Sequence, residues 1–377
     1  MTTLPQDEKF LKLQAVLEEI LVEEELRPLL EQSEKLRHYI GFEISGKVHI
    51  GSGLMSMRVI KELQALGVHT GVFLADWHSY INKKLGGDIQ TIREVAVSYF
   101  KEAMIASALC VGADPSKIEF ILADDVYNAD FWMTTLDVAS NITLSRGKRS
   151  VDIAGREVGD EMPIAILFYP PMQIADIFNM NIHLAHAGTD QRKAHVVARD
   201  ITSKMRHKVI TGPDGNPMKP IALHHHLLQG LAQPPTWPIP EAQKREVLIS
   251  MKMSKSRPDT AVFIHDSPED IQRKVQKAFC PPNETRFNPI IDWVEHLIFP
   301  LRGTFQLKRS EQFGGHTTFE TIDALKEAYT SGSIHPSDLK NATTEYLIDI
   351  LLPARQHFEQ PERKAALERV ETLRITR

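Results

Sequence analysis

The stretch RHYIGFEISGKVHIGS, residues 37–52, decides how the fold begins. Its first part, residues 37–45, reads as a strand that ends in a turn at Gly46. Beyond it, apolar side chains recur at helical spacing, at Leu54, Met57, Ile60, Leu63 and Leu66. Gly67 suits the end of that helix, and the largely apolar residues 68–76 predict a strand buried on both faces. A strand, a helix and a strand in this order predict a Rossmann-like parallel sheet.

The regions on either side extend this pattern. Residues 10–34 carry apolar side chains at helical spacing, which predicts one or two amphipathic helices before the first strand. Further strands are predicted at residues 118–123 and 182–185. A Pro- and Gly-rich loop at residues 230–240 reads as an insertion. After it, Ser267 is placed to cap a helix, and the pattern stays mostly helical to the end of the chain.

The sequence therefore predicts an α/β protein of two domains. The 377 residues suit that number of domains. A Rossmann-like domain with a parallel sheet is predicted over residues 1–260, and an α-helical domain over residues 261–377. The natural boundary lies near residues 257–266.

Composition excludes several classes of protein. A formal net charge of −5 argues against a protein that coats nucleic acid through overall positive charge, although a local basic patch remains compatible with it. Cys110 and Cys280 are too few for a disulfide framework and are expected to be unpaired thiols. The sequence shows no signal peptide and no run of roughly 18 apolar residues, so a cytoplasmic protein is predicted.

The turn after the first strand offers two phosphate-binding motifs. Residues 41–47 match Gly-x4-Gly-Lys, the opening of a P-loop, but Val48 stands where the hydroxyl ligand of Mg²⁺ is required. The alternative is that His49, Ile50, Gly51 and Ser52 open the helix. Gly51 would then allow close approach to the free N–H groups of the helix N-terminus, and His49 would point an N–H at a phosphate oxygen.

A second basic motif, KMSKS at residues 252–256, lies far downstream. Two lysines with hydroxyls in a loop suit a clamp on a triphosphate, whereas a solvated basic loop is the ordinary interpretation. Its pairing with the His49 turn favours the clamp.

This pair of motifs resembles the two signatures of class I aminoacyl-tRNA synthetases. The segments YIGFEISGKVHIG, LADWHSYIN, YPPMQIADI and GTDQRKAH resemble tyrosyl-tRNA synthetases of the archaeal and eukaryotic type, over residues 39–352. One departure is Ser52, where the family signature often has a second histidine. The resemblance implies that ATP, bound as its Mg²⁺ complex, activates tyrosine for transfer to tRNA-Tyr, without a tightly bound cofactor. The ATP-binding residues that it implies are His49, Gly51, Ser52, Gly188, Asp190, Lys252, Met253, Ser254, Lys255 and Ser256, with His49, Lys252 and Lys255 stabilising charge on the phosphates.

The amino-acid pocket is predicted around the segment YPPMQIADI. Gln173 and Asp176 are three positions apart and share a helix face, which by itself also fits a solvent-facing pair. The resemblance implies that Tyr39 and Asp176 bind the substrate phenol. It also assigns the α-amino group to Tyr169, Gln173 and Gln191, and the wall of the ring site to Ala75 and His78. The wall near Val126 and Tyr127 differs from relatives and is left open.

Basic residues flank this predicted pocket, and they predict contact with tRNA. Arg146, Lys148 and Arg149 precede it, and Arg192 and Lys193 follow Gln191. The resemblance places Arg149, Arg192 and Lys193 near the first base pair of the acceptor stem. It makes the helical domain an anticodon-binding domain, in which His335 and Asp338 contact the anticodon and Asp338 accepts from a guanine. Without the resemblance, residues 335–338 are only a helix start.

Three further expectations follow. Relatives of this family are homodimers, and the helical stretch at residues 92–109 has enough apolar residues for an interface. The run His224, His225 and His226 has no Cys or acidic partner at ligand spacing, so no metal site is predicted there. The rival functions are a tryptophanyl-tRNA synthetase, a tRNA-binding paralogue without activity, and a P-loop ATPase.

Overall fold

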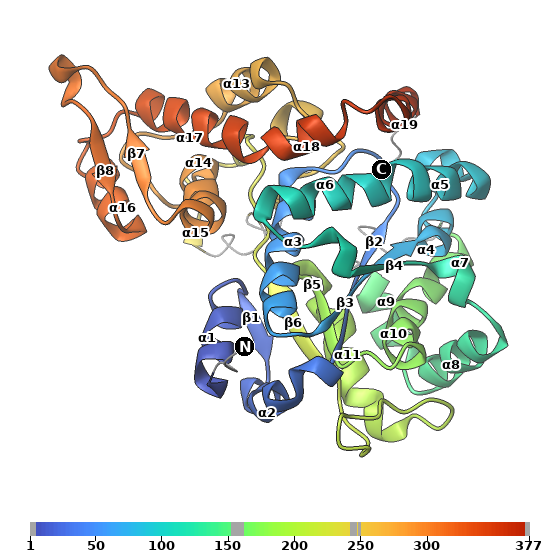
Figure 1. The fold of residues 1–377 in the computed structure, drawn as a ribbon. Coiled ribbons are helices and arrows are strands. Elements are labelled where there is room, and N and C mark those ends of the chain that lie inside the picture. The colour runs from blue at the N-terminus through green and yellow to red at the C-terminus, as the bar shows by residue number, and fades with distance from the viewer. Residues whose placement is uncertain (1–4, 152–161, 242–246, 248–249, 374–377) are drawn as a thin grey trace.

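The fold is organised around one six-stranded sheet, seen edge-on at the centre of Figure 1. The computed structural model describes residues 5–151, 162–241, 247 and 250–373. The strands lie in the order β1-β6-β5-β2-β3-β4, and β2 to β6 pair in parallel, whereas β1 pairs antiparallel with β6. Their bounds are β1 Glu19–Leu21, β2 Arg37–Glu43, β3 His69–Ala75, β4 Ile118–Leu122, β5 Leu184–Gly188 and β6 Ile221–His225. The predicted Rossmann-like parallel sheet is confirmed.

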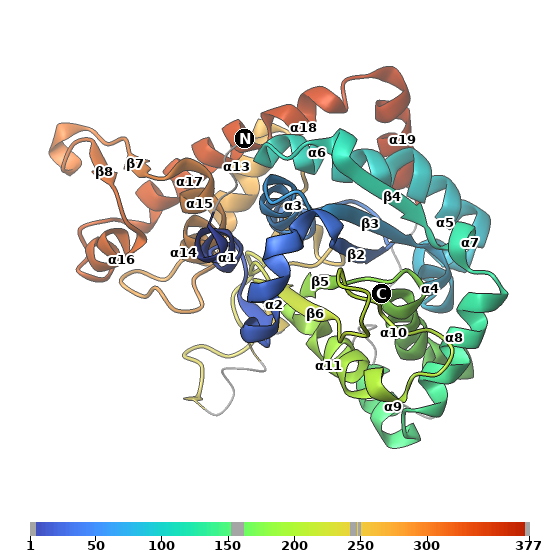
Figure 2. The ribbon, with the colours of Figure 1, turned by 60° about the horizontal axis from the view of Figure 1, so that its bottom comes forward.

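Helices cover both faces of the sheet (Figures 1 and 2). Neighbouring residues of a strand point to opposite faces, so Tyr39 and Ile40 on β2 enter two different hydrophobic cores. The helices before the C-terminal region are α1 Gln6–Gln14, α2 Glu23–Leu29, α3 Ile50–Ala65, α4 Asp76–Ile81, α5 Ile89–Val95, α6 Lys101–Val111, α7 Ala123–Val126, α8 Ala129–Ser140, α9 Leu144–Ser150, α10 Tyr169–Asn179 and α11 Arg192–Ile201. Shorter helical segments accompany them, among them the π-helix η3 Ala96–Phe100 and the 3₁₀-helix η6 Ile164–Phe168.

Strands β1, β5 and β6 differ from the prediction. The expected helical stretch at residues 10–34 is interrupted by β1, and β6 was not expected at all. Strand β5 begins at Leu184, two positions later than predicted. By contrast, β2, α3 and β3 follow the predicted order, and α3 is followed by Gly67 at a φ of 82°.

The C-terminal region is mostly helical, as predicted. Helix α13 starts where the cap was expected, because Ser267 Oγ accepts from the backbone N–H of Asp270 at 3.1 Å. A small two-stranded sheet, which the sequence did not predict, lies at the far end of this region (Figure 1). The elements are α13 Pro268–Lys277, α14 Pro289–Trp293, the π-helical turn η11 Val294–Ile298, α15 Phe299–Arg302, β7 Phe305–Leu307, β8 Thr317–Phe319, α16 Ile322–Thr330, α17 Pro336–Ile350, α18 Leu352–His357 and α19 Pro361–Thr372.

A short extended segment ties this region to the turn before α3. The N–H of Ile50 donates to the carbonyl of Val262 at 2.9 Å, and the N–H of Ile264 donates to the carbonyl of Val48 at 3.1 Å. Val48, Ile50, Val262 and Ile264 are all fully buried. The backbone on both sides of His49 is therefore held by a segment more distant in the chain than any strand of the sheet.

The stretch at residues 92–109 is not the exposed surface that a dimer interface at that place requires. Most of its apolar side chains, Tyr99 and Phe100 among them, are buried in the core formed with α3 and the C-terminal helices. Val97 and Leu109 are exposed. The apolar residues that suggested an interface instead pack against α3 on one side and the C-terminal helices on the other. No helix formed by the described residues is long and apolar enough to cross a membrane.

Candidate active site

A cavity of about 550 Å³ opens at the carboxyl ends of the parallel strands. It lies where the strand order reverses, since β3 and β4 extend from β2 on one side and β5 and β6 on the other. Ligands of open α/β sheets bind at such a point. All the residues predicted for tyrosine and ATP line this cavity: Tyr39, His49, Gly51, Ser52, Ala75, His78, Tyr169, Gln173, Asp176, Gly188, Asp190, Gln191, Lys252, Met253, Ser254, Lys255 and Ser256.

One end of the cavity is rich in hydrogen-bond donors. His49 caps α3, and its Nδ1 accepts from the N–H of Ser52 at 3.2 Å. Burial, together with the nearby charges of Lys255 and Lys252, lowers the pKa of His49 to about 3. The ring is therefore neutral, and because Nδ1 is the acceptor, Nε2 carries the proton and can donate to an anion.

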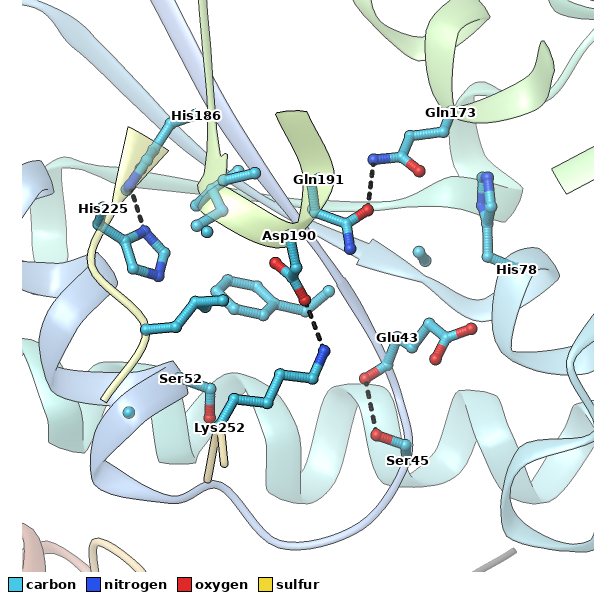
Figure 3. A pocket seen from close by; sticks show the side chains of 18 of the residues that line it. Glu43, Ser45, Ser52, His78, Gln173, His186, Asp190, Gln191, His225 and Lys252 are labelled. Carbon is cyan, nitrogen blue, oxygen red and sulfur yellow. Dashed lines mark hydrogen bonds and ion pairs between the residues drawn. The ribbon is translucent and has the colours of Figure 1, made fainter. Parts of the chain in front are cut away.

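The lysine loop closes over the same end. Lys252 Nζ lies 2.7 Å from Asp190 Oδ2, and Lys255 Nζ donates to Ser45 Oγ at 2.9 Å (Figure 3 shows the first of these). The backbone of the loop is held by the segment after β6, since Met253 N–H donates to the carbonyl of Leu228 at 2.9 Å. Two cations thus face one imidazole N–H, which is a geometry suited to a polyphosphate.

Burial lowers the pKa of Lys255 to about 8, whereas the nearby Glu43 carboxylate acts in the opposite direction. Glu43 lines the cavity and was not predicted as a site residue. It accepts from Asn82 Nδ2 at 2.7 Å and pairs with Lys84 at 3.4 Å. No spacing pattern in the sequence links these three residues.

The other end of the cavity holds a buried carboxylate. Asp176 is 3% exposed, and its Oδ1 accepts from the Tyr127 hydroxyl at 2.8 Å. Burial raises the pKa of Asp176 well above its usual range, and the bond from Tyr127 partly opposes that rise. Tyr39, also buried, lies beside it, and burial, followed by the Asp176 charge, raises the pKa of the Tyr39 hydroxyl. Tyr127, whose ring stacks on Phe131 at 3.5 Å, is therefore the residue that positions this carboxylate.

Between the two ends lies a polar wall. Gln173 Nε2 donates to Gln191 Oε1 at 3.2 Å, as Figure 3 shows. Gln173 Oε1 is buried without a partner among the described residues, so it can accept from a cationic group of a ligand. The Tyr169 ring stands beside it and meets His78 edge-on at 4.6 Å.

Gly188 shapes the cavity by having no side chain. A Cβ at this position would stand 2.5 Å from Leu227 Cδ2 and 2.9 Å from Asp190 Oδ1. Only glycine therefore lets Leu227 and the Asp190 carboxylate approach the end of β5 this closely.

The residues predicted to contact tRNA lie outside the cavity. Arg149 on α9 and Lys193 on α11 are exposed, and Arg192 is held by Glu19 through bonds of 2.8 and 2.9 Å. His335 caps α17, and Asp338 Oδ2 lies 4.0 Å from Arg309. Helix α17 is far from α9 and α11 in both views of the fold, so these two sets face separate regions (Figures 1 and 2).

The chain is similar to known proteins over nearly its whole length. The profile of the family described as tRNA synthetases class I (W and Y) matches residues 31–352. The tyrosine–tRNA ligase of Thermococcus kodakarensis is 50% identical over 364 residues, 96% of each chain. The crystal structure of tyrosyl-tRNA synthetase complexed with L-tyrosine from Pyrococcus horikoshii has a TM-score of 0.94 at 48% identity, covering 98% of this chain and 100% of that one. Tryptophanyl-tRNA synthetase from Aeropyrum pernix shares the fold, with a TM-score of 0.67 at 18% identity, over 99% of this chain and 94% of that one.

Proposed function

The chain belongs to the class I tRNA synthetases (W and Y), and on that premise we propose that it activates L-tyrosine with ATP and transfers it to the 3′ end of its tRNA. One observation carries the choice of tyrosine over phenylalanine: the buried Asp176 carboxylate beside Tyr39. The similarity to tyrosine–tRNA ligases supports tyrosine over tryptophan. A phenol can donate to that carboxylate, whereas phenylalanine would leave it buried with an acceptor unpaired.

In the first step the tyrosine carboxylate attacks the α-phosphorus of ATP, and pyrophosphate leaves. The Nε2–H of His49 and the ammonium groups of Lys252 and Lys255 stabilise the charge that develops on the phosphates. Gln173 Oε1 and Tyr169 hold the α-amino group, and Asp190 accepts from the ribose once Lys252 turns to the phosphates. In the second step the terminal ribose hydroxyl of the tRNA attacks the acyl carbon of the adenylate, the bond between that carbon and the phosphate oxygen breaks, and AMP leaves with the hydroxyl proton.

Mg²⁺ is proposed to arrive with ATP. The described residues at the phosphate end are hydroxyls, an imidazole and two ammonium groups, a set that suits phosphate oxygens rather than a protein-bound Mg²⁺. The Asp190 and Glu43 carboxylates of the cavity are already paired with Lys252 and Lys84. The metal then supplies charge neutralisation on the phosphates that it accompanies.

Amino-acid-dependent exchange of pyrophosphate into ATP tests this function. Tyrosine is expected to support exchange at least 100-fold better than tryptophan or phenylalanine, since both lack the phenol that Asp176 requires. Equal or better exchange with tryptophan would replace the proposal by the tryptophan enzyme of the same family. No exchange with any of the three would favour a binding protein without activity.

The exposed basic residues Arg149, Arg192 and Lys193 are proposed to receive the acceptor stem, and His335 and Asp338 the anticodon. The two sets lie far apart in the fold, which suits an RNA whose acceptor end and anticodon are also far apart. The unpaired bases of an anticodon expose N–H groups on their edges, and a carboxylate such as Asp338 can accept hydrogen bonds from them.

A twofold dimer is also proposed, through a surface different from the one the sequence suggested. The large apolar side chains exposed on α8, α9 and η6 are Trp132, Met133, Leu136, Leu144, Ile164 and Phe168. All three elements pack on α10, and so belong to one part of the molecule. Several large apolar side chains exposed on one part of a molecule are typical of an interface.

Light scattering at micromolar concentration is expected to give the mass of a dimer. The double change Met133→Asp and Leu136→Asp should shift the protein to monomer, because two charges would then be buried at the interface. Leu11→Asp, on α1 and equally exposed, is the matched control and should remain a dimer. A wild-type monomer under these conditions would contradict the proposal.

A further inference from the structure

Three metal-ligand side chains meet where the sheet joins the C-terminal helices. His226 follows β6 directly, whereas Asp292 lies on α14 and His296 on η11. One ligand atom of each residue lies within 4.8 Å of the other two. Turn η11 is a π-helix, an uncommon geometry that is frequent at functional sites. The acidic partner that the sequence around the three histidines lacks is therefore supplied by a distant helix.

His226 is oriented as a metal ligand usually is. Its Nδ1 lies 3.2 Å from Glu18 Oε2, and its Nε2 lies 2.8 Å from Asp292 Oδ1. When Nδ1 donates its proton to Glu18, Nε2 presents a lone pair to a carboxylate oxygen. In the metal-free chain a proton on Nε2 satisfies this pair, and a metal ion would take the place of that proton. In metal sites a histidine commonly donates one ring N–H to a carboxylate and binds the metal through its other nitrogen.

The other two proposed ligands, Asp292 and His296, have different surroundings. Asp292 is buried, and its Oδ2 accepts from the backbone N–H of Gln229 at 2.9 Å, which fixes the direction of Oδ1. Gln229 Oε1 is buried without a partner among the described residues, so it can accept from a metal-bound water. His296 stacks on His226 with ring centroids 3.7 Å apart, and its side chain is 31% exposed.

We propose that His226, Asp292 and His296 bind one divalent transition-metal ion, with Zn²⁺ as the expected occupant. Two imidazole nitrogens and one carboxylate oxygen are ligands that Zn²⁺ accepts, and they leave a fourth position for water. Bonds of about 2.1 Å place ligand atoms about 3.4 Å apart. The His296 ring must therefore rotate out of its stack on His226 to aim a nitrogen at the ion, which its partial exposure allows. His226 Nε2 and Asp292 Oδ1, now 2.8 Å apart, must also separate slightly.

The ion would join three parts of the chain that are far apart in sequence. Glu18 precedes β1, His226 follows β6, and Asp292 with His296 belongs to the C-terminal region. Asp292 also holds Gln229, whose backbone forms a bridge with Lys252. An occupied site would therefore stiffen the base of the lysine loop as well as the junction.

Co²⁺ titration of the tag-free, chelator-treated protein tests the site, because Co²⁺ takes the same ligands as Zn²⁺ and absorbs visible light. One Co²⁺ is expected per chain, displaced by Zn²⁺. His296→Ala should weaken Co²⁺ binding at least tenfold, since it removes one of three ligands and leaves the buried Asp292 in place. His207→Ala is the matched control: that histidine lies 3.4 Å from Asp130 on the surface and should leave Co²⁺ binding unchanged.

A second measurement guards against a folding defect in the variant. Zn²⁺ should raise the unfolding temperature of the wild type and of His207→Ala, but not that of His296→Ala. Equal Co²⁺ affinity in the wild type and His296→Ala, or no binding at micromolar Co²⁺, would overturn the proposal and leave an ion-paired cluster with a proton between His226 and Asp292. Neither ATP nor tyrosine enters these measurements, so their outcome is independent of the proposed function.

Discussion

Replacing Lys255 by alanine is expected to slow formation of tyrosyl-adenylate about 100-fold, while the affinity for tyrosine hardly changes. The ammonium group lines the phosphate end of the cavity and lies within hydrogen-bond distance of Ser45, away from the carboxylate of Asp176. A donor aimed at charge that develops in the transition state contributes roughly 3 kcal/mol to catalysis. Pyrophosphate exchange measures the rate, and equilibrium binding of tyrosine measures the affinity.

The pH profile distinguishes a charge effect from damage to the loop. Because burial lowers the pKa of Lys255 to about 8, the charge is present below that pH in the free enzyme and is lost above it. The kcat/KM for ATP should therefore fall as pH rises through about 8. Lys255→Arg keeps its charge throughout, so its profile should stay flat there.

The control for Lys255→Ala is Lys277→Ala, which removes an exposed lysine from α13. It should exchange at the wild-type rate. If Lys255→Ala also exchanges at that rate, Lys255 does not bind the phosphates in the transition state, and the lysine loop needs another role.

Asp176→Ala should shrink the preference for tyrosine over phenylalanine at least tenfold, the equivalent of about 1.4 kcal/mol. The Tyr127 hydroxyl already occupies Oδ1 of Asp176, which leaves Oδ2 for the phenol of the substrate. Tyrosine loses that acceptor in the variant, whereas phenylalanine is freed from facing an unpaired buried carboxylate. Exchange measured with each amino acid on the same protein gives the ratio, from which general damage to the fold largely cancels.

Two milder variants sharpen this result. Tyr39→Phe and Tyr127→Phe each remove one hydroxyl and keep the carboxylate, so both should lower the ratio by less than Asp176→Ala does. If Asp176→Ala lowers exchange with tyrosine and phenylalanine equally, Asp176 only supports the fold. The choice of tyrosine would then rest on similarity to relatives alone.

The sequence predicted those elements whose formation depends on neighbours in the chain. The strand at β2, the helix α3 and the strand β3 each carry their own periodic pattern, and they appear in the predicted order. Strand β1 has three residues and exists because it pairs with β6, which no local pattern reports. Strand β6 contains His224 and His225, so its apolar signal is weak, although pairing with β5 buries it.

The same distinction between local and distant contacts applies to the site. The family motifs identified the residues that line the cavity, because each motif is a contiguous segment. Tyr127 was left open, since nothing at its position in the sequence shows that it would reach Asp176, 49 positions away. Glu43 lies inside one of the matching segments, yet its role depends on Asn82 and Lys84, which follow α4. Contacts of this kind arise only when the chain is folded.

The backbone hydrogen bonds that join Val48 and Ile50 to Val262 and Ile264 also determine when, during synthesis, the site can fold. A ribosome delivers the chain from its N-terminus, and about 200 residues separate the two halves of this pairing. The turn that carries His49 emerges early but cannot be held in its final shape until Ile264 has left the ribosome. A half-made chain thus lacks the geometry to consume nucleotide, and the capacity for catalysis appears only when the C-terminal region is being translated.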